Sequence, residues 1–475
     1  MSDRLISTRD PERIEYGYSD ALLQGLAPDG GLYVPGAYPT VDEESLRAMS
    51  GLDYVDLFTR IKSLYVDDIP SETQAQLASA AYSKEKFPVP DGNIVPLTQV
   101  DRNFFIQNLS LGPTAAFKDM ALQPLGQDMN HALSEREQSL MLLGATSGDT
   151  GSAAEAAIKG LGRAGLVMLS PENGMSDFQS AQMSELTGGN ILNLSVRGNF
   201  DACQALVKAI KSDAEFADLG AVNSINWGRI ASQIPYYFSG YLHAVDGLIG
   251  RPVDFVVPTG NFGNILAGYI AREMGLPIRR LIVATNENSV LNNLIQDGKY
   301  QKTPAQITTS PSMDISEASN YERLLFDIFE GDALKVRDYM QMFKNTGTVR
   351  FEDFDLPYYT LREMGFDSGV SHAATRLESI RWVHAKRGIV IDPHTADAVT
   401  VASRKADEDV PIVCMSTALP VKFESTIESA LGFVPEREDP RFIGIEEREQ
   451  GGFVVVDDDI DEVKEKIRSF RSDSL

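Results

Sequence analysis

Short apolar runs that end in small polar loops and continue into alanine-rich stretches constrain the fold of this chain more than any other feature. Residues 139–160 predict a buried strand (SLMLLGAT), a turn and a helix, and residues 253–275 repeat that order from VDFVVP onward. A third apolar run, PIVCM, lies within residues 411–420 and again ends in a polar loop. Such alternation is typical of parallel βαβ units. We therefore expect an α/β protein whose ligands bind where the carboxyl ends of the strands meet.

The length of 475 residues predicts more than one packed domain. Residues 1–90 contain helical stretches and the turn-rich segment APDGGLYVP but little strand–loop–helix alternation, which indicates a separate N-terminal domain. Residues 91–430 carry the α/β pattern and the motifs described below. Residues 431–475 are highly charged around one apolar run and predict a charged C-terminal extension.

Charge and cysteine content limit the partners and the compartment. The 43 basic and 68 acidic residues give a net charge of −25, which disfavours binding to nucleic acid or to an anionic membrane. A small anionic substrate is compatible, because it responds to its local pocket. Only Cys203 and Cys414 occur, too few for a disulfide framework. The first residues lack the apolar core of a signal peptide, so we expect a cytoplasmic protein.

Sequence patterns also disfavour metal and dinucleotide sites. The five histidines are scattered, and none forms an H-E-x-x-H pair, so we expect no metal. The loop GATSGDTG differs from G-x-G-x-x-G, and no P-loop GK[ST] occurs.

The segment LGPTAAFKDM places Lys118 after small and apolar residues, where Pro113 and Thr114 suit the first turn of a helix. Burial lowers the pKa of a lysine, and the neutral amine is the form that makes Schiff bases. Lys118 is therefore a candidate nucleophile. The alternative is a surface lysine paired with Asp119.

The loop TGNFGN at residues 259–264 lies between a hydrophobic strand and a helix. Its two glycines allow consecutive N–H groups to point at one anion near the positive end of the helix dipole. A phosphate fits such a loop. The alternative is an ordinary glycine-rich turn.

Hydroxyl groups follow two other strands. The loop TSGDTG at residues 146–151 offers three hydroxyls at a helix start, either for a substrate carboxylate or cofactor oxygen or as helix caps made by Asp149 and Thr150. Ser416 and Thr417 follow PIVCM. A neutral hydroxyl can hydrogen-bond a pyridine nitrogen without protonating it. The alternative for these two residues is again a capping role.

Taken in order, LGPTAAFKDM, GATSGDTGSAA, NSINWGRI, VPTGNFGN and STALPVKF resemble the successive motifs of the threonine synthases, a family of fold-type II pyridoxal-phosphate enzymes. The resemblance extends to TNENSV, SPSMDI and DPHTA and points to the longer branch of the family. It implies two open, mostly parallel sheets flanked by helices, with the cofactor in the cleft between two subdomains, and a mainly helical N-terminal domain. Leu111 and Leu419 depart from the histidines that often occupy these positions.

The resemblance also implies roles for individual residues. Lys118 is expected to carry pyridoxal 5′-phosphate as a Schiff base and to be the catalytic residue. Thr417 is expected to face the pyridine nitrogen, and Asp149, where many fold-type II enzymes have asparagine, to border the 3′ oxygen. The residues expected at the cofactor phosphate are Gly260, Asn261, Phe262, Gly263 and Asn264. Those expected at the substrate are Thr146, Ser147, Gly148, Thr150, Asn226 and Arg229.

The implied reaction converts O-phospho-L-homoserine and water to L-threonine and phosphate, the last step of threonine biosynthesis. Arg229 is the candidate for the substrate phosphate, because a guanidinium offers paired donors, and the alternative is a structural ion pair. A serine/threonine dehydratase-like lyase would use the same lysine without a second phosphate site. A catalytically silent homologue that binds a phosphorylated metabolite is the alternative from another class. The sequence does not distinguish a monomer from a homodimer.

Overall fold

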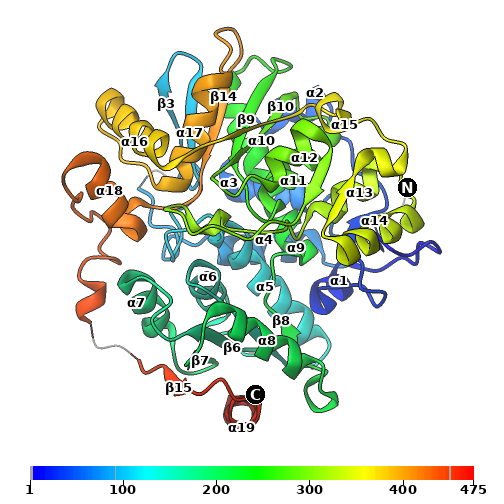
Figure 1. Cartoon of the computed structure of the whole chain (residues 1–475), viewed down its shortest axis with the longest axis vertical. Coiled ribbons are helices and arrows are strands. Elements are labelled where there is room, and N and C mark those ends of the chain that lie inside the picture. The colour runs from blue at the N-terminus through cyan, green and yellow to red at the C-terminus, as the bar shows by residue number, and fades with distance from the viewer. Residues whose placement is uncertain (1–3, 91, 449–450, 475) are drawn as a thin grey trace.

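The computed structural model describes residues 4–90, 92–448 and 451–474, which fold around two large sheets (Figure 1). The larger sheet has the strand order β13-β10-β9-β14-β4-β3, and only β3 runs antiparallel to its neighbour. Its strands are β3 (Leu97–Asp101), β4 (Phe104–Asn108), β9 (Val253–Pro258), β10 (Ile278–Thr285), β13 (Phe366–Val370) and β14 (Ile412–Ser416).

The smaller sheet has the order β15-β7-β6-β5-β8 and is parallel throughout. Its strands are β5 (Leu140–Ala145), β6 (Ala164–Pro171), β7 (Ile191–Val196), β8 (Gly220–Ala221) and β15 (Val454–Val456). The connecting helices are α6 (Asp149–Ile158), α7 (Asp177–Leu186), α8 (Phe200–Lys211) and η1 (Ala214–Phe216). Every residue of β6 is buried, as expected for a central parallel strand. The prediction of two open, mostly parallel sheets is confirmed.

Helices cover both faces of the larger sheet, because successive side chains of its strands point to opposite sides. Phe255 of β9 packs against Tyr237 on one face, whereas Val256 belongs to a second core cluster on the other face. The first face is covered by α9 (Trp227–Ala231), α10 (Ile234–Val245) and α11 (Gly263–Glu273). The second is covered by α16 (Ala373–Arg387), α17 (Pro393–Lys405) and α18 (Glu424–Leu431).

The N-terminal region is mainly helical, as predicted. It comprises β1 (Leu5–Ser7), α1 (Tyr18–Gln24), β2 (Tyr33–Pro35), α2 (Glu43–Met49), α3 (Tyr54–Lys62) and α4 (Ser71–Ala81). Helix α3 packs on α10, and α4 packs on α5 (Asp119–Glu135). Its buried residues join the same core cluster as both sheets. Residue 91, where we place the boundary of this domain, lies outside the described residues.

The chain between β10 and β13 adds a peripheral helical layer and a segment that runs along the cleft. Its elements are α12 (Val290–Asp297), β11 (Lys299–Gln301), η2 (Pro311–Met313), α13 (Tyr321–Ile328), α14 (Ala333–Thr346), β12 (Thr348–Arg350), η3 (Phe351–Phe354) and α15 (Thr360–Glu363). Strands β11 and β12 pair as a short antiparallel ribbon. The turn η2 projects from this layer to the region between the two sheets.

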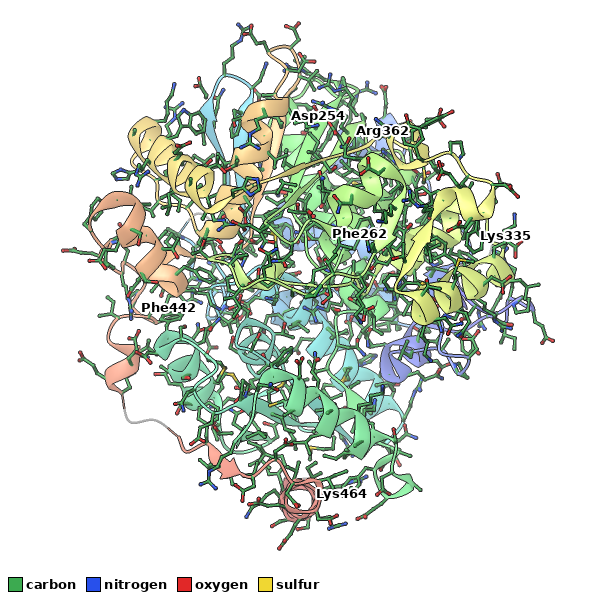
Figure 2. All side chains as sticks on the ribbon, viewed as in Figure 1. Asp254, Phe262, Lys335, Arg362, Phe442 and Lys464 are labelled. Atoms are coloured by element: carbon green, nitrogen blue, oxygen red, sulfur yellow. The ribbon has the colours of Figure 1, made fainter. Side chains whose placement is uncertain are left out.

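The C-terminal chain connects the two halves of the molecule. It runs from η4 (Pro420–Phe423) and α18 through η5 (Ile445–Glu447) to β15 and α19 (Ile460–Ser474), from the upper to the lower half of Figure 1. Phe442, labelled in Figure 2, contacts Phe178 of α7 with ring centroids 5.5 Å apart. Val456 and Ile467 are buried in the core beside β7 and α8. The charged segment therefore completes the edge of the smaller sheet.

Candidate active site

Lys118 occupies the position immediately before helix α5. The chain approaches it in turns, and Ala115 has a φ of 58°, which a right-handed helix does not allow. The predicted helix start at Pro113 and Thr114 is therefore wrong. The helix begins later because these turns present Lys118 at the helix N-terminus, facing the gap between the sheets.

The ammonium group of Lys118 faces Asp149, and not Asp119. Its Nζ lies 3.4 Å from Oδ2 of Asp149, the first residue of α6. The Asp119 carboxylate instead accepts hydrogen bonds from the backbone N–H and the hydroxyl of Thr114, both at 2.8 Å. The side chain of Lys118 is 12% exposed. The alternative of a surface lysine paired with Asp119 is thus wrong.

The carboxylate of Asp149 is surrounded by donors from four separate elements. Its Oδ1 lies 2.7 Å from Nζ of Lys422 and accepts a hydrogen bond of 2.9 Å from Nε2 of Gln179. Its Oδ2 faces Lys118 and accepts a bond of 3.1 Å from the hydroxyl of Ser312. Although burial would raise it, the charges of Lys422 and Lys118 hold the pKa of Asp149 well below its usual range. The carboxylate is therefore ionised.

The pKa of the Lys118 amine is also lowered, which disfavours its charged form. Burial lowers its pKa, and the nearby charges of Lys422 and Arg229 lower it further, whereas Asp149 opposes them. The positive end of the α5 dipole also disfavours an ammonium group at this position. The lowered pKa raises the fraction of the neutral amine, which is the form that acts as a nucleophile or takes up a proton.

The loop at residues 260–264, which we call the cradle, joins β9 to α11 near the centre of the molecule, where Figure 2 labels Phe262. Phe262 has a φ of 65°, and a Cβ on Gly260 would lie 2.9 Å from the carbonyl oxygen of Ser312. The backbone N–H groups of residues 260–264 donate no hydrogen bond to any described residue. The cradle therefore offers consecutive free donors at the N-terminus of an 11-residue helix.

Asn264 anchors the cradle to α10. Its Oδ1 accepts hydrogen bonds from the hydroxyls of Tyr236 and Tyr237, at 2.7 and 2.8 Å. Its Nδ2 is buried and has no partner within the described chain. An unpaired buried donor costs free energy unless a ligand satisfies it, so this amide is placed to bind one.

Ser416 and Thr417 at the end of β14 differ in how their hydroxyls are used. The hydroxyl of Ser416 is hydrogen-bonded to that of Thr395, 3.1 Å away. Thr417 is fixed by its backbone, since its carbonyl accepts a bond of 2.8 Å from the N–H of Phe117. Its hydroxyl makes no hydrogen bond to any residue that the structure describes. Of the two, Thr417 is the one left available for a ligand.

Arg229 is buried and has no carboxylate partner in the described parts of the chain. The residue is 6% exposed, and the only side-chain hydrogen bond that it makes to a described residue runs from Nη1 to the carbonyl of Asn223 at 2.8 Å. Burial lowers its pKa to about 10. The alternative of a structural ion pair is therefore wrong, and the remaining guanidinium donors are free for an anion.

The side-chain amide of Asn226 makes hydrogen bonds within the protein. Its Oδ1 accepts a bond of 3.0 Å from the N–H of Gly228, and its Nδ2 donates at 2.8 Å to the carbonyl of Leu22 in the N-terminal region. These bonds cap helix α9 and connect it to α1. Its contact with substrate remains a prediction.

The loop at residues 146–151 forms one wall of the site. The hydroxyl of Thr146 accepts bonds from the N–H groups of Gly148 and Gly151, at 3.0 and 2.8 Å, and so shapes the loop. Gly148 has a φ of 133°, and a Cβ there would lie 2.5 Å from the Gln179 side chain. The loop therefore requires glycine and keeps its remaining hydroxyls, on Ser147 and Thr150, toward the cavity.

A cavity of about 1490 Å³ lies between the two subdomains. Its lining brings together Lys118, the loop at residues 146–150, Asn261, Ser312 and Lys422. Ligand pockets commonly occupy about 300–1,000 Å³, so this volume admits a cofactor together with a small substrate. Among the residues that the structure describes, no group of three or more metal-ligating side chains occurs, and no helix is long and apolar enough to cross a membrane.

Sequence reasoning missed three residues around Asp149. Lys422 lies in the quoted motif STALPVKF and Ser312 in SPSMDI, but their side chains were given no role. Gln179 belongs to α7 and carries no sequence signal. The one available signal was Lys422 itself, a lysine shortly after the end of a predicted strand. Its acidic partner, Asp149, had already been identified in another loop.

The residues present fit pyridoxal phosphate. The cradle supplies free N–H donors for a phosphate, and a Cβ at Gly260 would collide with the segment that packs over it. The amine of Lys118 is buried and its pKa is lowered. The hydroxyl of Thr417, directly after β14, has no partner in the described chain.

Comparison with known proteins identifies the family of the chain. Residues 4–82 match the family described as threonine synthase N terminus, residues 92–340 the family of pyridoxal-phosphate dependent enzymes, and residues 395–467 the family described as threonine synthase, C-terminal. The chain is 46% identical to threonine synthase from Corynebacterium glutamicum over 91% of each chain. It is 44% identical to the enzyme from Methylobacillus glycogenes, over 91% of this chain and 93% of that one.

A solved structure gives the same result in three dimensions. The crystal structure of the PLP-bound threonine synthase from Brucella melitensis superposes with a TM-score of 0.93 at 39% identity, covering 98% of this chain and 99% of that one. Three family matches in order, relatives above 40% identity and this superposition all point to one family. The chain belongs to the threonine synthase family of pyridoxal-phosphate-dependent lyases.

Proposed function

We propose that the chain converts O-phospho-L-homoserine and water to L-threonine and phosphate, with Lys118 as the cofactor-bearing lysine and proton carrier. The observation that carries this proposal is the position of Lys118. Its amine has a lowered pKa and lies in a cleft that also contains an unpaired anion cradle.

Two parts of the chain would hold the cofactor. Residues 260–264 would donate backbone N–H groups to its phosphate, and the hydroxyl of Thr417 would hydrogen-bond its pyridine nitrogen. When bound, pyridoxal phosphate withdraws electron density from the bonds at the substrate's Cα. Asp149 would lie beside the 3′ oxygen, held there by Lys422 and Gln179.

Lys118 would move the protons. As a neutral amine it can take the proton from Cα and later return it, which is general acid–base catalysis. The reaction also moves protons at Cβ and Cγ, so the carrier must reach adjacent carbons of the substrate. The flexible side chain of Lys118, at the helix N-terminus, is suited to carry these protons one after another.

The substrate would be held at both of its charged ends. The hydroxyls of Ser147 and Thr150, with the N-terminus of α6, would receive the α-carboxylate. Arg229 would bind the phosphate, because its guanidinium lacks a carboxylate partner and offers paired donors. This second anion site distinguishes the proposed substrate from the uncharged side chains that a dehydratase-like lyase would accept.

We also propose a cytoplasmic enzyme whose partners are small molecules. Cys203 and Cys414 are both buried free thiols, which fits a reducing compartment. Size-exclusion chromatography with light scattering would separate a monomer from a homodimer.

Two measurements on the purified holoenzyme test the proposal. Borohydride reduction should fix the mass of the reduced cofactor on the peptide that contains Lys118. Phosphate release should require O-phospho-L-homoserine. Label on another lysine would contradict the role of Lys118, and preferred release of ammonia from serine or acetate from O-acetylserine would favour another fold-type II lyase.

A further inference from the structure

Lys422 is a fully buried lysine at the back of the cleft. It lies in η4, its side chain is 0% exposed, and its Nζ lies 2.7 Å from Oδ1 of Asp149. The same ammonium group donates a hydrogen bond of 2.9 Å to the carbonyl of Thr114, in the turns that lead to Lys118. Lys422 therefore contacts both the acidic partner of Lys118 and the backbone that presents it.

The two lysines do not share Asp149 equally. Charge-assisted hydrogen bonds between ammonium and carboxylate groups are about 2.7–2.9 Å long. Lys422 meets this distance, whereas Lys118 lies 3.4 Å away. Lys422 is thus the principal counter-ion of Asp149, and Gln179 and Ser312 complete the carboxylate's hydrogen bonds.

We propose that Lys422 is a positioning residue for the reaction: it neutralises Asp149, so that this carboxylate does not hold Lys118 as an ammonium ion. The inference rests on the proposed function, in which Lys118 must be neutral to take up a proton. Lys422 acts through Asp149 and through its own charge, without contact with substrate.

The charges around Lys118 support this role. They are Asp149 on α6, Lys422 on η4 and Arg229 on α9, and Lys422 also faces Asp119 at the start of α5. Without Lys422, Asp149 would remain as a buried carboxylate with Lys118 as its nearest cation. Such a pair favours the charged amine. Loss of Lys422 would therefore raise the pKa of Lys118 for two reasons that act in the same direction.

The pKa of Lys118 can be measured without turnover. Full-length protein, before the cofactor is added, is treated with acetic anhydride over a range of pH, and the Lys118 peptide is quantified by mass spectrometry. The midpoint for Lys118 should rise by about one pH unit in Lys422→Met. In the loaded enzyme, where the Lys118 amine is free only after substrate has bound, the acid limb of the kcat profile should move in the same direction.

A double variant distinguishes this electrostatic role from a merely structural one. Lys422→Met combined with Asp149→Asn removes both charges of the pair, so the Lys118 midpoint should return to within about 0.3 pH unit of the wild type. If Lys422→Met fails to fold, Asp149→Asn is compared with the double variant, and the double variant should have the higher midpoint. Lys62→Met is the matched control, since it breaks another buried lysine–aspartate pair away from the cleft.

The outcomes are separable. An unchanged Lys118 midpoint in Lys422→Met, or equal midpoints in Asp149→Asn and the double variant, would overturn the proposal and leave Lys422 as a clamp on the turn before α5. Failure of the proposed function would appear independently, as borohydride label on a lysine other than Lys118 in the wild-type protein.

Discussion

Helix α5 is associated with two buried lysine–aspartate contacts whose surroundings differ. Near its middle, Asp128 accepts bonds from Lys62 of α3 and from the hydroxyl of Tyr18. This pair is enclosed, and its one cation and one anion cancel. At the N-terminus of α5, one carboxylate, Asp149, lies between two lysines and opens onto the cavity.

The difference indicates which buried charges are structural and which serve the reaction. A closed, neutral pair holds the N-terminal region against α5 and leaves no charge for a ligand. In the cluster around Asp149 two lysines share one carboxylate, and Arg229 nearby has no carboxylate partner in the described chain. A buried guanidinium without a carboxylate favours an anionic ligand, such as a phosphorylated amino acid.

The largest effect is expected at the open cluster. Lys118→Ala should lower turnover by a factor on the order of 10⁴, because it removes the carrier for every proton transfer. The variant should still bind pyridoxal phosphate without a covalent bond, through residues 260–264. Equilibrium dialysis and single-turnover kinetics measure the two effects, and retention of wild-type turnover would remove Lys118 from the mechanism.

Breaking the enclosed pair of Lys62 and Asp128 should change the stability of the protein and not its activity. Lys62→Met leaves Asp128 buried without its cation, so the free energy of unfolding should fall by about 3–5 kcal/mol. Denaturant titration measures this loss. Among molecules that remain folded, kcat should stay close to the wild-type value, and a specific loss of kcat would show that the enclosed pair also influences the reaction.

Three strands of the two sheets were predicted well because their signals are local. Apolar runs with polar ends identified β5, β9 and β14, each within one residue of its observed bounds. The start of α5 was predicted wrongly, since Pro113 and Thr114 suit a helix but the left-handed conformation of Ala115 excludes one. That conformation depends on the pairing of Ala116 with Ala418, a contact that no local pattern contains.

The candidate site could be proposed from sequence where residues lie within motifs, and it was missed where a role depends on a distant partner. Lys118, Asp149 and the cradle were identified from loops at strand or helix ends. Lys422 gains its role only because the fold brings its ammonium group, on η4, to within 2.7 Å of Asp149 at the start of α6. Sequence spacing alone contains no distance between those two loops.

A smaller effect is expected from the unpaired arginine. Arg229→Gln should lower kcat/KM for O-phospho-L-homoserine about 100-fold, since hydrogen bonds to charged groups contribute about 1.5–3 kcal/mol each. Steady-state kinetics over a range of substrate concentrations measures it. Binding of pyridoxal phosphate should be unchanged. An unaltered kcat/KM would place the substrate phosphate elsewhere in the cavity.

The smallest effect is expected at the end of β14, where the same contrast between open and closed groups recurs within two adjacent residues. The hydroxyl of Thr417 has no partner in the described chain, whereas that of Ser416 is bonded to Thr395. Thr417→Val should therefore lower turnover about fivefold, the loss of one neutral hydrogen bond, and should shift the absorbance of the bound cofactor. Thr417→Ser should keep both properties.

Ser416→Ala is the matched control, because its lost bond lies within the protein. This variant should lower the free energy of unfolding by about 1 kcal/mol and leave the cofactor spectrum unchanged. If the cofactor spectrum shifted in Ser416→Ala and not in Thr417→Val, Ser416 would be the residue that contacts the cofactor. The absence of a protein partner would then not identify the ligand-binding hydroxyl at the end of β14.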